Sequence, residues 1–141
     1  MTGSSLSTVE VLVLASAALH AGFQVTVSVL VYPALLRAEP FGPAHARHSR
    51  GIAPIVVVVY GALVATGTAR LVAGDLDAAS LVALGGAALA GLTTALVAAP
   101  THGRLAHGRT DALARRLTRA DLVRTAGAVL GLAGALVAVL G

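Results

Sequence analysis

The sequence of 141 residues lacks cysteine, tryptophan and lysine, and it contains few aromatic or charged residues. The absence of cysteine excludes disulfides, thiolate metal sites, iron–sulfur clusters and covalent c-type haem attachment. Aromatic residues make up 3% of the chain, which leaves no stacking platform for single-stranded nucleic acid. Charged residues make up 11% and hydrophobic residues 57%, whereas an ordinary soluble domain is about 25% charged. This composition predicts a membrane protein.

Every basic residue is an arginine, and the net charge is +4. A positive chain can bind nucleic acid, but here all the arginines except Arg70 flank two connecting segments, 37–50 and 100–124. Such clustering is typical of a membrane topology signal, so we do not expect a nucleic-acid partner. The abundance of alanine, glycine, valine, leucine and arginine is typical of a bacterial genome rich in GC.

Four apolar segments are long enough to span a bilayer, at residues 9–36, 52–72, 78–99 and 122–141. A spanning helix needs about 20 apolar residues, and no segment shows the alternation of a spanning strand. The sequence therefore predicts an all-α protein, a four-helix transmembrane bundle with short loops. We expect a single domain over residues 1–141, embedded in the lipid bilayer of the cell membrane as a multi-pass protein.

The arginines also predict the orientation of the bundle. With an even number of spans, the connections 37–50 and 100–121 lie on one side of the membrane. The positive-inside rule makes that side cytoplasmic, so both termini are expected on the non-cytoplasmic side. The first residues lack the basic region of a secretory signal, and we expect the first span to be retained.

Prolines and caps indicate where the helices begin and end. Pro43 can occupy a first helical turn, so the second helix is expected to begin near it, well before its apolar part. Pro100 follows the third span and is expected to bend a continuation that reaches His102. Thr110 can cap a short amphipathic helix over 110–119, which we expect to lie along the cytoplasmic surface.

A polar stripe runs through the first apolar segment, where Ser16, His20, Gln24, Ser28 and Tyr32 recur every fourth residue. Positions four apart share one face of a helix. Polar groups in a membrane face a bundle interior or a water-filled cavity. The stripe therefore predicts a polar core, which serves either to cross-link helices or to form a ligand site or proton path.

Three charged residues bear on that choice. A proton pump would need a deep carboxylate, and the acid nearest a predicted span is Glu10, at the outer edge, which argues against a pump. Asp121 and Arg124 are three apart and can pair at the start of the fourth span. Arg124 is the arginine expected to point inward, where it would hold an anionic group or a haem propionate; the alternative is a snorkelling anchor at the interface.

Histidines gather near the predicted cytoplasmic face. His45 and His48 are three apart, and His102 and His107 lie in the third connection. Imidazole is a ligand for zinc, copper and iron, and two histidines on facing helices can hold a haem. His45, His48 and His102, with His107 as a further ligand, therefore predict a metal or haem site. The alternative is a set of interfacial polar residues that bind nothing.

Small residues mark the fourth span, where Gly127 and Gly131 form a GxxxG pair that Gly134 follows. Small residues let helix backbones approach closely in lipid. We consider two interpretations, which are packing inside the bundle and contact with a second copy or with a partner in a membrane complex.

Several residues together resemble a known group of proteins. They are Gln24, Val31, Tyr32, Pro33, Phe41, His45, His48, Thr93, Thr94, Pro100, Thr101, His102, Arg124 and Thr125. On these residues, from about Gly22 to Thr125, the chain resembles small bacterial four-helix membrane proteins related to the anthrone-oxygenase-like membrane families. The resemblance implies a polar core of His45, His48, His102 and Gln24. It also implies a redox role on an aromatic or other small lipophilic substrate.

The leading functional prediction is a small membrane redox or oxygenase-like protein with a histidine-rich site at the cytoplasmic face. Copper, iron, zinc and haem are its candidate cofactors, and His20, Gln24, Tyr32 and Arg124 are its candidate ligand-binding residues. The alternatives are a non-catalytic accessory subunit of a larger membrane complex and a small transporter. The sequence assigns no reaction and no catalytic residue.

Overall fold

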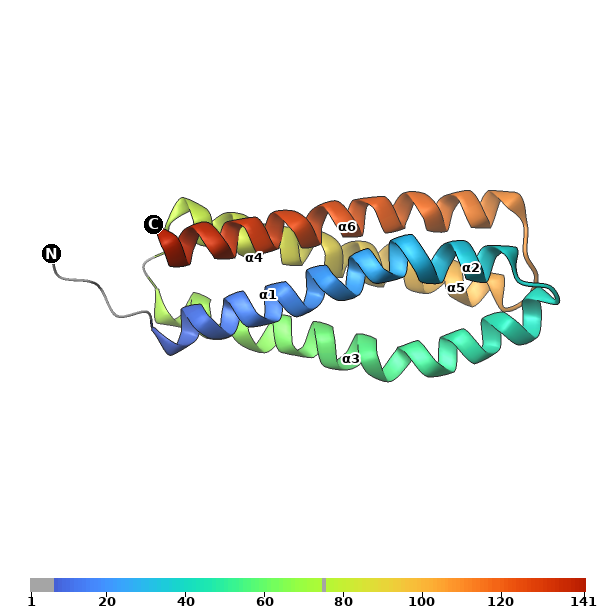
Figure 1. Ribbon diagram of the computed structural model, residues 1–141, viewed down its shortest axis with the longest axis horizontal. Coiled ribbons are helices and arrows are strands. Elements are labelled where there is room, and N and C mark those ends of the chain that lie inside the picture. Colours follow the sequence, from blue (N-terminus) through green and yellow to red (C-terminus); the bar gives the residue numbers. More distant parts are fainter. Residues whose placement is uncertain (1–6, 75) are drawn as a thin grey trace, which may run out of the picture.

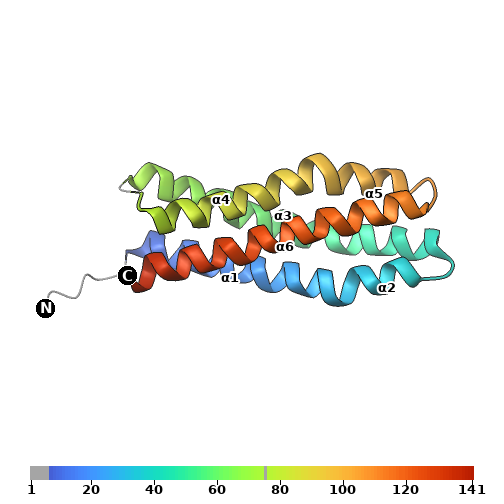
Figure 2. The ribbon, with the colours of Figure 1, turned by 90° about the horizontal axis from the view of Figure 1, so that it is seen from above.

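The computed structural model describes residues 7–74 and 76–141, and these form helices without any strand. Four long helices, each long and apolar enough to cross a membrane, cover Thr8–Arg37, Phe41–Ala73, Ala78–Leu105 and Asp111–Leu140. They run side by side along one axis (Figures 1 and 2). The predicted all-α four-helix bundle is confirmed, and its apolar helices fit a multi-pass membrane protein. The orientation of the termini stays a prediction.

Two of the long helices are divided by a π-helical turn. The elements are α1 (Thr8–Thr26), η1 (Val27–Val31), α2 (Tyr32–Arg37), α3 (Phe41–Ala73), α4 (Ala78–Thr93), η2 (Thr94–Ala98), α5 (Ala99–Leu105) and α6 (Asp111–Leu140). Each π turn lies just before a proline, Pro33 or Pro100. Proline lacks an N–H and its ring crowds the preceding turn. The wider turn accommodates this disruption, and such π bulges are frequent at functional sites.

The helices extend further than the apolar segments at the end of the bundle where α2 meets α3 and α5 meets α6; we call this the histidine end. α3 begins at Phe41, close to Pro43 as expected, and α5 continues to Leu105, past His102. These extensions place polar residues of the two connections on helices rather than on loops.

The separate surface helix expected over 110–119 is wrong, because this segment is the first part of one continuous α6. Thr110 caps it as predicted, since its side chain accepts a hydrogen bond from the N–H of Leu113 at 3.2 Å. Leu117 and Ala120 are buried. The segment therefore packs its apolar side against the bundle and aligns with the rest of α6.

Glycines bring α4 and α6 into backbone contact. A Cβ on Gly86 would lie 2.5 Å from the carbonyl oxygen of Gly127 and 2.5 Å from the nitrogen of Gly131, and one on Gly134 would lie 2.5 Å from the nitrogen of Ala83. The GxxxG pair therefore serves packing inside the chain. Contact of Gly127, Gly131 and Gly134 with a second copy or a membrane partner stays a prediction.

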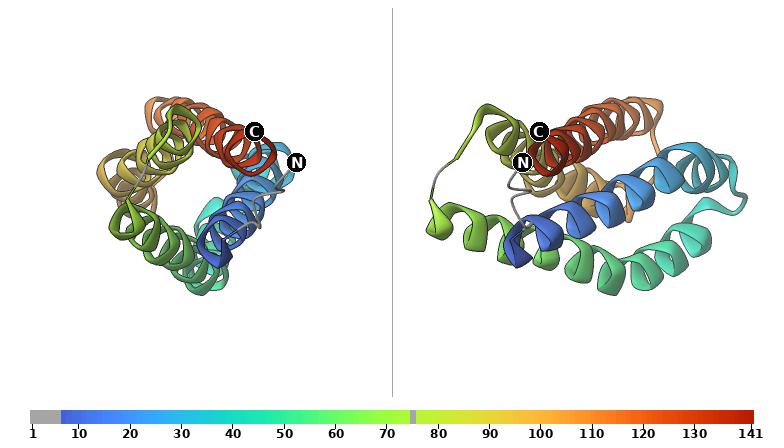
Figure 3. Two further views of the ribbon diagram at one scale, coloured as in Figure 1. Left: turned by 90° about the vertical axis from the view of Figure 1, so that its left-hand side faces the viewer. Right: turned by 60° about the vertical axis from the view of Figure 1, so that its left-hand side comes forward.

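The contact between α3 and α4 is much looser than the other three contacts between neighbouring helices. Viewed along the axis, the helices form a square (Figure 3). α6 packs closely against α4 and α1, and α1 packs against α3, whereas α3 contacts α4 sparsely. Of the four long helices, α3 has the smallest buried share. The α3–α4 seam is therefore the open side of the bundle.

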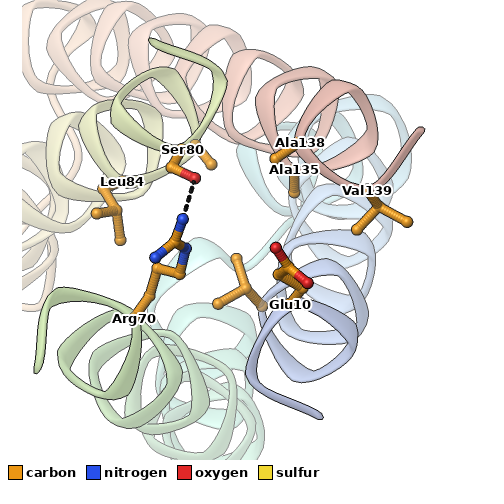
Figure 4. Close-up of a pocket in the computed structure, with 9 residues that line it drawn as sticks. Glu10, Arg70, Ser80, Leu84, Ala135, Ala138 and Val139 are labelled. Atoms are coloured by element: carbon orange, nitrogen blue, oxygen red, sulfur yellow. Dashed lines mark hydrogen bonds between the residues drawn. The ribbon is translucent and has the colours of Figure 1, made fainter. Parts of the chain in front are cut away.

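At the end opposite the histidine end, polar side chains join α3 to α4. Arg70 donates a hydrogen bond from Nη2 to the hydroxyl of Ser80 at 3.1 Å, and Glu10 of α1 faces them across a cavity of about 10 Å³ (Figure 4). The carboxylate of Asp77 caps α4 by accepting from the N–H of Ser80 at 2.7 Å. The hydroxyl and the N–H of Ser80 lower the pKa of Asp77. These contacts fix the turn between α3 and α4.

The α4–α6 contact generates a prediction about stability. Gly86→Ala should lower the free energy of unfolding by about 1–3 kcal/mol, because its methyl group would overlap the α6 backbone. Gly85→Ala is the control, since a Cβ there meets nothing within 4 Å. The measurement is the midpoint of unfolding in sodium dodecyl sulfate, followed by circular dichroism. Equal midpoints for the two variants would contradict the close contact.

Candidate functional site

The polar stripe of the first long helix faces the bundle interior. His20 and Gln24 are 1% and 0% exposed, and Ser16 and Tyr32 are buried too. The hydroxyl of Ser16 lies 2.8 Å from that of Thr66 on α3. The stripe therefore supplies polar groups along the whole length of the core.

Gln24 links a buried carboxylate to a buried guanidinium. Its Nε2 donates to Oδ1 of Asp121 at 2.8 Å, and its Oε1 accepts from Nη2 of Arg124 at 2.9 Å. The hydroxyl of Ser28, in η1, donates to Oδ2 of Asp121 at 2.6 Å. Asp121 and Arg124 are 5% and 3% exposed. The inward orientation expected for Arg124 is confirmed, and its connection to Asp121 runs through Gln24.

From Arg124 the hydrogen bonds continue to the histidine end. Nη1 of Arg124 donates to the hydroxyl of Tyr32 at 3.0 Å, and this hydroxyl lies 2.9 Å from Nε2 of His102. Nδ1 of His102 lies 3.1 Å from Nε2 of His45. A neutral imidazole donates at one nitrogen and accepts at the other. His102 can therefore relay a proton between Tyr32 and His45 by exchanging tautomers.

Three of the predicted histidines meet, and the fourth does not. The ring of His102 stacks on those of His45 and His48, with centroids 5.4 Å and 5.7 Å apart. Nε2 of His48 is buried and has no hydrogen-bond partner among the described residues. His107 is exposed, and its Nδ1 lies 2.9 Å from the carbonyl oxygen of Gly103. We call His45, His48 and His102 the histidine cluster.

The cluster is not a ready-made metal centre. Within residues 7–74 and 76–141, no group of three or more histidine, aspartate or glutamate side chains is arranged to hold a metal ion. The 3.1 Å between Nε2 of His45 and Nδ1 of His102 suits a hydrogen bond. It also suits two nitrogen ligands on one ion at bond lengths of about 2.0–2.1 Å. The metal or haem site stays a prediction.

A cavity of about 350 Å³ adjoins the cluster, between α3 and the third long helix. It is lined by Tyr32, His48, Ser49, Ile52, Ala53, Val56, Val57, Thr94, Ala98, Ala99, His102 and Arg124. We call it the side cavity. Its polar groups converge from all four long helices, and its remaining lining is largely apolar. A pocket of a few hundred Å³ with a few convergent polar groups is typical of a small-molecule site.

A second cavity continues along the open seam towards the other end of the bundle. Its volume is about 470 Å³, and its lining is apolar apart from Tyr60 and Thr68. The hydroxyl of Tyr60 lies 2.8 Å from that of Thr94, which lines the side cavity. The Tyr60–Thr94 pair therefore stands between the two cavities.

His20 lies outside this hydrogen-bonded chain. Its ring meets that of Tyr60 edge-on, with centroids 5.1 Å apart, and its Nε2 has no partner among the described residues. The ligand-binding role of His20 stays a prediction. His20 packs in the middle of the core, whereas Gln24, Ser28 and Tyr32 join the network.

Asp121 lies deeper in the bundle than its place outside the fourth apolar segment predicts. The sequence places the start of the fourth apolar segment after Asp121 and, with Glu10 as the acid nearest a span, predicts no deep carboxylate. This prediction is wrong, since α6 carries Asp121 into the core. The signal was the helical spacing of Asp121, Arg124 and Thr125, which places all three on one face.

No family model, curated protein or solved structure matches this chain. The function is therefore inferred from the chemistry of the site alone. The arrangement can bind an oxygen-bearing group beside apolar surface and move a proton along imidazole and phenol groups.

The network generates a prediction about coupled charges. Arg124→Gln alone should lower the free energy of unfolding by about 3–5 kcal/mol, because the carboxylate of Asp121 stays buried without a compensating charge. Asp121→Asn with Arg124→Gln removes both charges and should cost clearly less than the sum of the two single changes. The measurement is a double-mutant cycle, in which unfolding midpoints in sodium dodecyl sulfate are compared for the parent protein, the two single variants and the double variant. Arg119→Gln on the exposed side of α6 is the control, and strictly additive effects would refute the coupling.

Proposed function

We propose that this protein binds a small lipophilic molecule in the side cavity and that the histidine cluster performs acid–base chemistry on it. The observation that carries the proposal is the convergence of Tyr32, His48, His102 and Arg124 on one largely apolar cavity. The cavity lies at the loosely packed α3–α4 seam. A molecule dissolved in the bilayer would reach it sideways, without crossing water.

Polar contacts, rather than apolar burial, would supply the selectivity. Lipid tails are as apolar as leucine, so apolar surface gains little by moving from a bilayer into a protein groove. A hydroxyl or carbonyl group without a partner in hydrocarbon costs several kcal/mol. Such a group would find Nε2 of His48, which lacks a partner among the described residues, and the guanidinium of Arg124. The site therefore favours lipophilic molecules that carry an oxygen-bearing polar group.

The charge balance of the core favours an uncharged ligand group. Asp121 and Arg124 offset each other through Gln24. An additional buried anion would be left without a full counter-charge, and burying it would carry a large desolvation cost. We therefore expect alcohols, phenols or carbonyl compounds to bind better than carboxylates of the same size.

The hydrogen-bonded chain suggests how a proton would leave the bound molecule. The imidazole of His48 or His102 would accept it, and the path from Tyr32 through His102 to His45 would carry it to the histidine end. General acid–base catalysis of this kind contributes about 10²–10⁴-fold to a rate. A redox or oxygenase-like reaction, which the family resemblance implies, would start from such a deprotonation and would need dioxygen as an external oxidant.

Naphthol, a fluorescent lipophilic phenol, tests the binding site in nanodiscs. The protein itself has no tryptophan, so it adds little fluorescence of its own. Ala99→Phe fills the mouth of the side cavity and should weaken naphthol binding by about tenfold, equivalent to 1.4 kcal/mol. Ala95→Phe is the matched control, because Ala95 is exposed on the same helix and does not line the cavity.

The same assay examines the histidines. His48→Ala should weaken naphthol binding, whereas His107→Ala should leave it unchanged, because His107 is exposed and lies outside the cluster. If empty nanodiscs take up as much naphthol as loaded ones, or if Ala99→Phe behaves as the parent protein does, the proposed site is wrong.

A metal- or haem-dependent redox protein is the second candidate. Two observations favour it, which are the 3.1 Å between Nε2 of His45 and Nδ1 of His102 and the buried, unpartnered Nε2 of His48. The ring of His48 stacks on that of His102, with centroids 5.7 Å apart, and would supply the third nitrogen. Tyr32 would support His102 from its other nitrogen, as the outer partners of ligating histidines do. In this candidate the ion would supply Lewis-acid or redox chemistry.

Metal analysis and visible absorption after native purification test this second candidate. The expected result is a stoichiometric metal or haem that is lost in both His45→Ala and His102→Ala and kept in His107→Ala. The matched substitution at exposed His107 controls for adventitious binding. Only trace metal and no haem absorption, with no gain after reconstitution with copper, iron, zinc or haem, would eliminate the candidate.

A further inference from the structure

A separate groove lies on the other side of the third long helix, between η2 and the first part of α6. Its volume is about 630 Å³, and it is lined by Thr93, Val97, Ala112, Arg115, Arg116, Arg119, Ala120 and Val123. We call it the arginine groove. It shares no lining residue with the side cavity.

No acidic residue lines the groove beside its three arginines. Arg115, Arg116 and Arg119 are exposed, and none has a hydrogen-bond or ion-pair partner among the residues that the structure describes. Like charges four positions apart destabilise a helix. The carboxylate of Asp121 is bound to Gln24 and Ser28 inside the bundle. Asp111 lies one turn before Arg115 on α6 but does not line the groove, so the groove has an excess of positive charge that an anionic molecule would offset.

The rest of the groove indicates what carries that charge. Val97, Ala120 and Val123 give it an apolar floor beside the arginines. Arginine binds phosphate oxygens through two parallel N–H donors, and the floor offers a surface for a hydrocarbon chain. A free phosphate would use the arginines alone, and a zwitterionic lipid brings no net charge.

We propose that the arginine groove binds an anionic phospholipid, with its phosphate against Arg115, Arg116 and Arg119 and an acyl chain along the apolar floor. The groove lies within an apolar four-helix bundle that fits a bilayer, so lipids are its natural neighbours. This site is independent of the proposed function, because it lies on a different face and needs no histidine.

Native mass spectrometry of the full chain, titrated with dioleoyl phosphatidylglycerol or dioleoyl phosphatidylcholine, tests the proposal. The parent protein should bind the anionic lipid more tightly. Arg115→Gln, Arg116→Gln and Arg119→Gln together should weaken that binding by about tenfold or more, since each arginine near an anionic surface contributes about 1 kcal/mol before screening.

The matched control removes three positive charges at positions outside the arginine groove. Arg50, Arg104 and Arg109 are exposed and line none of the described cavities. Their joint change to glutamine should leave the affinity for phosphatidylglycerol nearly unchanged, because none of the three lines the groove. If the two triple variants lose affinity equally, the attraction is diffuse and the groove is not a site.

A second variant tests the floor without changing any charge. Val123→Phe, at a position that is 41% exposed, should fill the groove and weaken phosphatidylglycerol binding, with circular dichroism confirming the fold. Unchanged affinity in Val123→Phe overturns the acyl-chain contact. Equal affinity for the two lipids, or displacement of phosphatidylglycerol by equimolar glycerol phosphate, overturns the lipid assignment.

Discussion

The neutralisation of a carboxylate and a guanidinium inside an apolar bundle is the constraint on which this structure depends. Neither Asp121 nor Arg124 can be buried alone in a low-dielectric medium, because an isolated buried charge costs far more than a helix contact returns. Gln24 solves the problem with one amide, whose nitrogen binds the carboxylate and whose oxygen binds the guanidinium. This linkage also fixes the register of α1 against α6, and the remaining polar groups are arranged around it.

Backbone geometry brings the other polar groups to the same level. Ser28 lies in η1 and Thr94 lies in η2, and each π turn precedes a proline. A π turn rotates the residues that follow it relative to an uninterrupted α-helix. In the first long helix, Tyr32 follows such a turn and meets Arg124 and His102. Thr94 and Ala98 of η2 line the side cavity, and η1 leads directly into Tyr32, which lines it from the first long helix.

The sequence predicted the features that depend on hydropathy and periodicity. The number of long helices, the inward polar stripe and the convergence of His45, His48 and His102 follow from segment length, a spacing of four and the topology of connections. Asp121 was undervalued because a hydropathy window ends at the first charged residue. The π turns could not be predicted either, since a proline disrupts a helix without specifying how the helix responds. The loose α3–α4 seam depends on side-chain packing, which no pattern of apolar residues encodes.

The unequal packing of the four long helices has a mechanical consequence. α1, α4 and α6 form a stiff frame because glycines lock α4 to α6 and Gln24 ties α1 to α6, whereas α3 is attached mainly along one edge. Helices adjust to the thickness of the surrounding hydrocarbon by tilting. In this architecture such an adjustment would fall mostly on α3, so a thinner or thicker bilayer would narrow or widen the mouth of the side cavity.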